Sequence, residues 1–168
     1  FGNEVIDIKR VDDIYNIKTK KDTYKTRWVV NAAGLYSDRV SKMLGIGDYT
    51  IHPCRGEYFI LDEKVGSKLS LPAYPVPNPK EGGLGIHLTP TIDGNVFIGP
   101  SSEYIDERDD YSATQKIMDL LIKDGGRIFP HIRRDDFIRN FAGIRPKLAS
   151  KEEGGYHDFV IEMRDKSP

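Results

Sequence analysis

Residues 29–44 read Val-Val-Asn-Ala-Ala-Gly-Leu-Tyr-Ser-Asp-Arg-Val-Ser-Lys-Met-Leu, and this stretch joins a strand pattern to a helix pattern. The apolar residues at its start end a strand predicted for residues 24–30. Ser37 is a good N-cap for a helix that stops at Gly45. A strand that passes through a turn of small residues into a helix is therefore predicted here.

Apolar and polar residues alternate in several other short runs, which is the signature of half-buried strands. Such strands are predicted at residues 4–9, 13–19, 58–61, 84–88, 95–99 and 157–162. Asp93-Gly94 is a strong hairpin signal between the fourth and the fifth of them. A second helix is predicted from a capping box at residues 112–115 to about Lys123, and Gly125-Gly126 ends it. The sequence therefore predicts an α+β fold with more strand than helix.

Composition argues against several classes of protein. The 168 residues carry 25 basic and 26 acidic side chains, whereas a dedicated nucleic-acid binder usually has a basic excess, so no nucleic-acid partner is predicted. No apolar run approaches the roughly 20 residues that span a bilayer. The single cysteine, Cys54, excludes an internal disulfide and indicates a reducing, cytoplasmic setting. The histidines show no metal-ligand spacing, so no metal site is predicted.

The turn Ala32-Ala33-Gly34 has two interpretations. It is either a tight turn kept small for packing of the helix on the strand, or a place where a ligand approaches the backbone near a helix N-terminus. No complete Gly-x-Gly-x-x-Gly motif supports a free-standing dinucleotide site, because Gly45-Ile46-Gly47 and Gly83-Leu84-Gly85 both lack the third glycine.

Arg145 and His87 are candidates for binding and for acid–base chemistry. Arg145 stands between an apolar run and Pro146, and its guanidinium can hold a carboxylate or a phosphate with two hydrogen bonds. An ion pair within the protein is the more common use of such an arginine. His87 faces away from the core if its neighbours Ile86 and Leu88 are buried, and it is then either a base or a structural histidine.

The run Arg55-Gly56-Glu57-Tyr58 begins a strand with a charged cluster. Arg55 and Tyr58 can line a site, although an Arg55–Glu57 pair at a strand edge is the simpler interpretation. Residues 106–110 read Asp-Glu-Arg-Asp-Asp, which predicts a solvated loop ahead of the second helix.

Six short motifs follow one another along nearly the whole chain. They are Val29–Ser37, Pro53–Tyr58, Tyr74–Pro79, Leu84–Gly94, Gly99-Pro100 and Ala142–Pro146. Together and in this order they resemble the FAD-dependent oxidoreductases of the D-amino-acid-oxidase-like superfamily. Within it the chain is most similar to the L-2-hydroxyglutarate dehydrogenases and to related proteins named glycerol-3-phosphate dehydrogenases.

The resemblance implies a Rossmann-like FAD domain and a substrate domain that covers the flavin. The substrate domain would be a mixed, largely antiparallel β-sheet with flanking helices. Residues 1–48 would be part of the FAD domain, 49–141 the substrate domain, and 142–168 the start of the return to the FAD domain. The residues implied to bind FAD are Ala33, Gly34 and Gly143.

The resemblance also implies oxidation of the CH–OH group of a small anionic hydroxy compound, of the glycerol 3-phosphate or L-2-hydroxyglutarate type. Arg145 would bind the anionic group, with Arg55 and Tyr58 as further substrate contacts. His87 would accept the hydroxyl proton while hydride passes to the flavin. The alternatives are an amino-acid or amine oxidase of the same superfamily and a non-enzymatic α+β binding module. The sequence does not decide whether the longer protein has a peripheral membrane or quinone link, nor what its oligomeric state is.

The chain begins with Phe1-Gly2 rather than with methionine. It also lacks the strand–Gly-x-Gly-x-x-Gly–helix unit that holds the pyrophosphate in the superfamily. We therefore expect an internal piece of a longer flavoenzyme, which by itself does not hold FAD firmly and is inactive.

Overall fold

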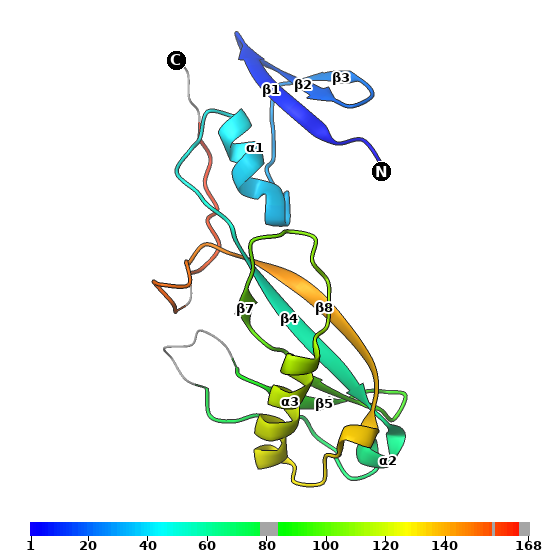
Figure 1. Ribbon diagram of the computed structural model, residues 1–168. Coiled ribbons are helices and arrows are strands. Elements are labelled where there is room, and N and C mark those ends of the chain that lie inside the picture. The colour runs from blue at the N-terminus through cyan, green and yellow to red at the C-terminus, as the bar shows by residue number, and fades with distance from the viewer. Residues whose placement is uncertain (78–83, 156, 165–168) are drawn as a thin grey trace.

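The computed structural model describes residues 1–77, 84–155 and 157–164, and it contains two antiparallel sheets joined by a short helical segment (Figure 1). The smaller sheet is the predicted meander of β1 (Val5–Val11), β2 (Ile14–Thr19) and β3 (Thr23–Thr26). The 3-10 turn η1 (Gly34–Tyr36) and helix α1 (Ser37–Met43) follow it, and α1 lies beside β1. The chain then enters the larger sheet.

The larger sheet has five strands in the order β5-β6-β4-β7, with β8 on the other side of β4. Its strands are β4 (His52–Leu61), β5 (His87–Pro90), β6 (Val96–Gly99), β7 (Glu103–Tyr104) and β8 (Phe137–Lys147). Its helical elements are α2 (Glu63–Gly66), α3 (Gln115–Ile128) and η2 (Arg134–Asp136). Strand β8 pairs with β4 along the whole of β4, and the domain boundary predicted between residues 141 and 142 falls inside β8.

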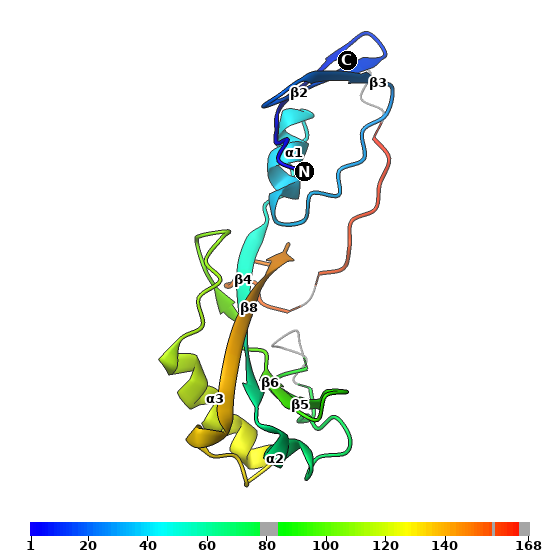
Figure 2. The same ribbon diagram turned by 90° about the vertical axis from the view of Figure 1, so that its right-hand side faces the viewer.

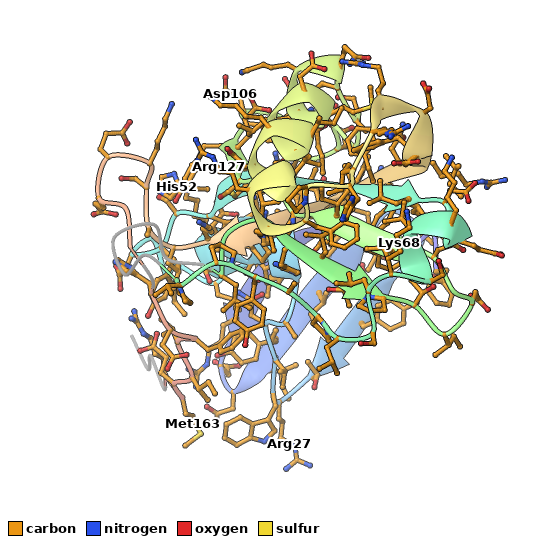
Figure 3. All side chains as sticks on the ribbon, turned by 90° about the horizontal axis from the view of Figure 1, so that it is seen from below. Arg27, His52, Lys68, Asp106, Arg127 and Met163 are labelled. Atoms are coloured by element: carbon orange, nitrogen blue, oxygen red, sulfur yellow. The ribbon has the colours of Figure 1, made fainter. Side chains whose placement is uncertain are left out.

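Helix α3 covers one face of the larger sheet, as Figure 2 shows from the side, and the core lies between them. The fully buried aliphatic side chains of this core are Leu61, Leu88, Val96, Ile98 and Leu121. Charged side chains such as Lys68, Asp106 and Arg127 lie on the outer surface (Figure 3). The mixed helix and antiparallel strand content confirms the α+β class. No helix in the described ranges is long and apolar enough to cross a membrane.

One predicted strand is shorter than expected, and another is absent from the structure. Strand β3 ends at Thr26, so residues 27–30 are in no strand, and Trp28 and Val30 are 73% and 88% exposed. Residues 157–162 likewise form no strand, and Phe159 is exposed. A strand needs a hydrogen-bonded neighbour, and among the described residues neither segment pairs with one. Both segments were predicted as strands only because apolar residues recur in them locally.

The second helix begins later and ends later than predicted. Its N-cap is Thr114, whose side chain accepts a hydrogen bond from the backbone N–H of Ile117. The helix continues through Gly125 and Gly126 to Ile128, so the glycines do not end it. A Cβ at Gly125 would overlap Cδ1 of Ile98, which shows that this glycine serves close packing of the helix on the sheet.

The predicted hairpin at Asp93-Gly94 is confirmed, because β5 pairs with β6 in antiparallel register around that turn. Gly94 has a φ of +88°, which favours glycine. Strand β5 occupies residues 87–90 rather than 84–88, and residues 78–83, including the Asn78-Pro79 end of the proline-rich motif, lie outside the described residues.

Arg108 joins the segment of η1 and α1 to the larger sheet, although a solvated loop was predicted for it from the sequence. Its Nη1 and Nη2 each donate to one carboxylate oxygen of Asp38, both at 2.7 Å. It also donates to the backbone carbonyls of Leu35 and Ile51. Asp38 is only 3% exposed, and the hydrogen bond from Arg108 lowers the pKa of Asp38 from its ordinary value of 3.8 to about 2. A largely buried ion pair therefore fixes η1 and α1 against the start of β4.

We expect Asp38→Asn to lower the free energy of unfolding by about 2 kcal/mol at pH 7, because the folded-state pKa of Asp38 is depressed. That stabilisation is present above the unfolded pKa and is lost as the pH falls from about 4 to about 2. The difference between wild type and variant in urea unfolding should therefore shrink over this window. Asp106→Asn, at an exposed position of the same connection, is the control. A difference that is unchanged at pH 2 would contradict the assignment.

Candidate functional site

The pairing of β4 with β8 places Tyr58, Gly143 and Arg145 on one face of the larger sheet. In this register Gly56 lies opposite Gly143 and Tyr58 opposite Phe141. Directly opposite residues in an antiparallel pair point to the same face. The Tyr58 and Phe141 rings accordingly stack, with centroids 5.2 Å apart and an interplanar angle of 6°. The His87 ring lies 6.5 Å from the Tyr58 ring, so β5 adds its histidine to the same face.

Arg145 lies on this face, opposite Cys54, and its side chain crosses β4. Its Nη2 donates a 2.6 Å hydrogen bond to the carbonyl oxygen of Ser101. The guanidinium rests on Gly56, where a Cβ would overlap Nη2 and lie 3.1 Å from Cζ. Within the described ranges no carboxylate lies within 4 Å of the guanidinium nitrogens, so its other N–H groups are available to an anion.

Ser101 supplies the carbonyl oxygen that accepts the hydrogen bond from Arg145. Sequence reasoning did not identify Ser101 as a site residue. Ser101 is 4% exposed, and its backbone N–H donates to the carbonyl of Glu57 at 3.1 Å. Its Oγ accepts a hydrogen bond from the backbone N–H of Glu57 at 3.0 Å. Two bonds to one residue of β4 fix the position of Ser101. A serine after Gly99-Pro100 carries no local signal for this role.

His87 is held in one orientation by a bond within its own segment. Its Nδ1 lies 3.0 Å from the carbonyl oxygen of Gly85, and Gly85 reaches this geometry with a φ of +72°. A carbonyl oxygen accepts only, so Nδ1 of the neutral ring carries the proton and Nε2 is the free acceptor. The neighbour Leu88 is fully buried, which confirms that His87 faces away from the core.

Arg55 and Glu57 lie on the opposite face of β4, toward α3. Nη2 of Arg55 contacts Glu103 at 2.8 Å and Glu57 at 3.3 Å, and Nη1 pairs with Asp110. Burial acts to lower the pKa of Arg55, but the hydrogen bond that Arg55 donates to Glu103 and the charges of Asp110 and Glu57 outweigh it, so the pKa is raised. The structure therefore brings Tyr58, His87 and Arg145 together but does not bring Arg55 to them.

Glu57 connects this ionic cluster to the N-terminus of α3. Its side chain is fully buried and accepts a 2.6 Å hydrogen bond from the backbone N–H of Thr114. A carboxylate at this position satisfies a free N–H group of the first helical turn and complements the helix dipole. Asp110 in the same cluster has a lowered pKa, mainly because Ser112 donates hydrogen bonds to it.

The three candidate FAD residues come from two elements that contact each other. The turn η1, which begins at Gly34, contacts β8, which carries Gly143. Ala33, Gly34 and Gly143 are exposed, and an added Cβ at either glycine would meet no atom within 4 Å. Gly143 lies two residues from Phe141 on β8, so its exposed backbone is on the same face as the stacked Tyr58 and Phe141 rings. The described residues contain no group of three or more His, Cys, Asp or Glu side chains that could hold a metal ion.

This face therefore combines an arginine with free donors, a histidine with a free Nε2, the half-buried Tyr58 ring and the exposed Phe141 ring. The family model described as "FAD dependent oxidoreductase" (DAO) matches residues 1–165. The chain belongs to this DAO family of FAD-dependent oxidoreductases.

Two relatives illustrate its place in the family. A protein named glycerol 3-phosphate dehydrogenase from Caloramator mitchellensis is 35% identical over 161 residues, which cover 96% of this chain and 32% of the relative. Human mitochondrial L-2-hydroxyglutarate dehydrogenase is 29% identical over 179 residues, which cover 86% of this chain and 38% of the relative. The chain thus spans about a third of the length of these relatives.

Solved structures of flavoproteins share the fold. The FAD-bound L-α-glycerophosphate oxidase from Mycoplasma pneumoniae matches with a TM-score of 0.70 at 24% identity, over 90% of this chain and 40% of that one. Glycine oxidase from Bacillus cereus matches with a TM-score of 0.70 at 18% identity, over 86% of this chain and 37% of that one.

We expect Gly56→Ala to weaken anion binding about tenfold, because the new Cβ displaces the Arg145 guanidinium from Ser101. The guanidinium is the end of a flexible side chain, so the fold should persist. The measurement is the dissociation constant of acetate and of inorganic phosphate, from titrations followed by NMR. Gly126→Ala, where a Cβ meets no atom within 4 Å, is the matched control. Equal affinities in both variants would refute the idea that the missing side chain at Gly56 makes room for the Arg145 guanidinium.

Proposed function

We propose that the protein containing this chain oxidises the CH–OH group of a small anionic hydroxy compound, of the glycerol 3-phosphate or L-2-hydroxyglutarate type. The observation that carries the proposal is the joint presence, on one face, of an Arg145 guanidinium with free donors and of Nε2 of His87. The names of the relatives support the same substrate class.

In this proposal Arg145 binds the carboxylate or phosphate of the substrate with the donors that Ser101 does not occupy. Fixing the anionic end orients the carbinol carbon, which lowers the entropic cost of reaction. Nε2 of His87 accepts the hydroxyl proton, while the bond from Nδ1 to Gly85 stabilises the ring in that orientation. Tyr58 lies between these two ends and contacts the substrate.

Ala33, Gly34 and Gly143 are the residues that we propose for FAD, since their exposed backbone admits close approach. When bound, FAD supplies the electron acceptor of the reaction. We propose the same division of the chain as above, with 1–48 and 142–168 belonging to an FAD domain and 49–141 to a substrate domain. Residues 1–168 by themselves should not hold FAD firmly, and stoichiometric flavin absorbance of the purified chain would disprove this.

The second candidate is an amino-acid or amine oxidase, which the fold shared with glycine oxidase supports. An arginine binds the carboxylate of an amino acid as well as that of a hydroxy acid. The two candidates differ in the group that is oxidised, so a substrate panel separates them.

We expect the full-length, FAD-loaded protein to oxidise L-2-hydroxyglutarate or glycerol 3-phosphate and not amino acids. His87→Asn should lower kcat by roughly 10²- to 10⁴-fold with a similar KM, because asparagine keeps a donor toward Gly85 but lacks Nε2. Steady-state kinetics with an artificial electron acceptor measures both constants. His131→Asn, at an exposed histidine, is the control. Turnover of amino acids alone, or an unchanged kcat in His87→Asn, would contradict the proposal.

A further inference from the structure

Lys147 lies two residues beyond Arg145 on β8 and belongs to the same face of the sheet. It is paired with His52, in the register that pairs Arg145 with Cys54. Its Nζ lies 5.1 Å from the centroid of the Tyr104 ring. Tyr104 is paired with Cys54 on the other side of β4. Both side chains therefore cross β4 in the same direction, Arg145 over Gly56 and Lys147 toward Tyr104.

Arg145 and Lys147 are neighbouring cations, and neither forms an ion pair with a described residue. Their Cα atoms are about 7 Å apart along the strand. In the part of the chain that the structure describes, neither nitrogen group lies within 4 Å of a carboxylate. The nearby acids are used elsewhere, since Glu103 pairs with Arg55 on the α3 side of the sheet. Two adjacent cations on one face therefore present a positive charge that no described side chain neutralises.

The position of Lys147 is fixed before any ligand binds. The Tyr104 ring attracts the ammonium group through a cation–π interaction, and the hydroxyl of Tyr104 donates a 3.1 Å hydrogen bond to the carbonyl of Ala149. Arg145 is fixed in turn by Ser101 and Gly56. Cations that are already oriented lose little side-chain entropy when an anion binds, which favours affinity.

We propose that Lys147 is a second anion-binding residue beside Arg145, so that the site prefers a substrate with two negative charges over a monocarboxylate. The inference rests on the proposed function, because it assumes that Arg145 binds the substrate. The second charge is either a second carboxylate, bound by Lys147 alone, or the second charge of a phosphate that both cations share. An amino acid, with one carboxylate and a positive amino group, does not match this pair.

The test compares dianions with monoanions in the full-length, FAD-loaded protein. Lys147→Gln should raise the KM for L-2-hydroxyglutarate or glycerol 3-phosphate about tenfold, with kcat within twofold. The KM for L-2-hydroxybutyrate, which has one charge, should stay unchanged. Lys147→Arg should restore the dianion KM, and Lys151→Gln, at an exposed lysine, should change neither constant. The dianion whose KM rises identifies the source of the second charge.

A binding measurement separates this inference from the proposed function. Calorimetric titration with the unreactive anions glutarate, inorganic phosphate and butyrate does not depend on turnover. Lys147→Gln should weaken glutarate or phosphate about tenfold and leave butyrate unchanged. Equal effects on glutarate, phosphate and butyrate, or no effect on any, would overturn the role of Lys147. A wild type that binds dianions but oxidises no hydroxy compound would instead overturn the proposed function and leave the dianion preference standing.

Discussion

The antiparallel register between β4 and β8 is the constraint on which the candidate site depends. It sets Arg145 opposite Cys54 and Gly143 opposite Gly56, so that the guanidinium lies over the one residue of β4 without a side chain. Side chains alternate between the faces of a strand, and a slip by one residue would turn Arg145 toward α3. The buried charges of Arg55 and Glu57 fix the orientation of β4 itself, since turning β4 over would expose them on the other face and leave α3 without its acceptor.

Charged side chains are ion-paired on the face of the larger sheet that α3 covers, whereas Arg145 on the other face forms no ion pair with a described residue. The difference follows from burial. Arg55 and Glu57 are almost fully buried, and a buried charge is tolerated only when it is paired and hydrogen-bonded. Arg145 lies on the exposed face, where water solvates a cation until a ligand replaces that water. Ser101 links the faces, because its backbone and hydroxyl bind the main chain of Glu57 while its carbonyl binds Arg145. The face that carries the ion-paired Arg55 and Glu57 thereby serves as a rigid support for the face that carries Arg145.

Sequence reasoning succeeded where local pattern decides structure and failed where distant residues do. The Asp93-Gly94 turn and the meander follow from local preferences, and the order of short motifs identified the family. The pair of Asp38 with Arg108 spans 70 positions and has no local signal. The first three residues of β4, His52–Cys54, were missed because a proline in their middle interrupts the alternation that marks a strand. The second half of the strand predicted at 24–30 failed for the opposite reason, since residues 27–30 have the pattern of a strand but no described strand pairs with them.

The Asp38–Arg108 pair connects the part of the chain proposed for the cofactor with the part proposed for the substrate. Arg108 binds the carbonyls of Leu35 and Ile51, which lie on either side of the passage from α1 into β4. Charged hydrogen bonds from Arg108 therefore hold η1 and α1 against the start of β4. Such bonds are directional, so they hold the turn that begins at Gly34 at a defined place relative to the start of β4. Arg108, which lies outside both proposed sites, thus helps to set the geometry between them.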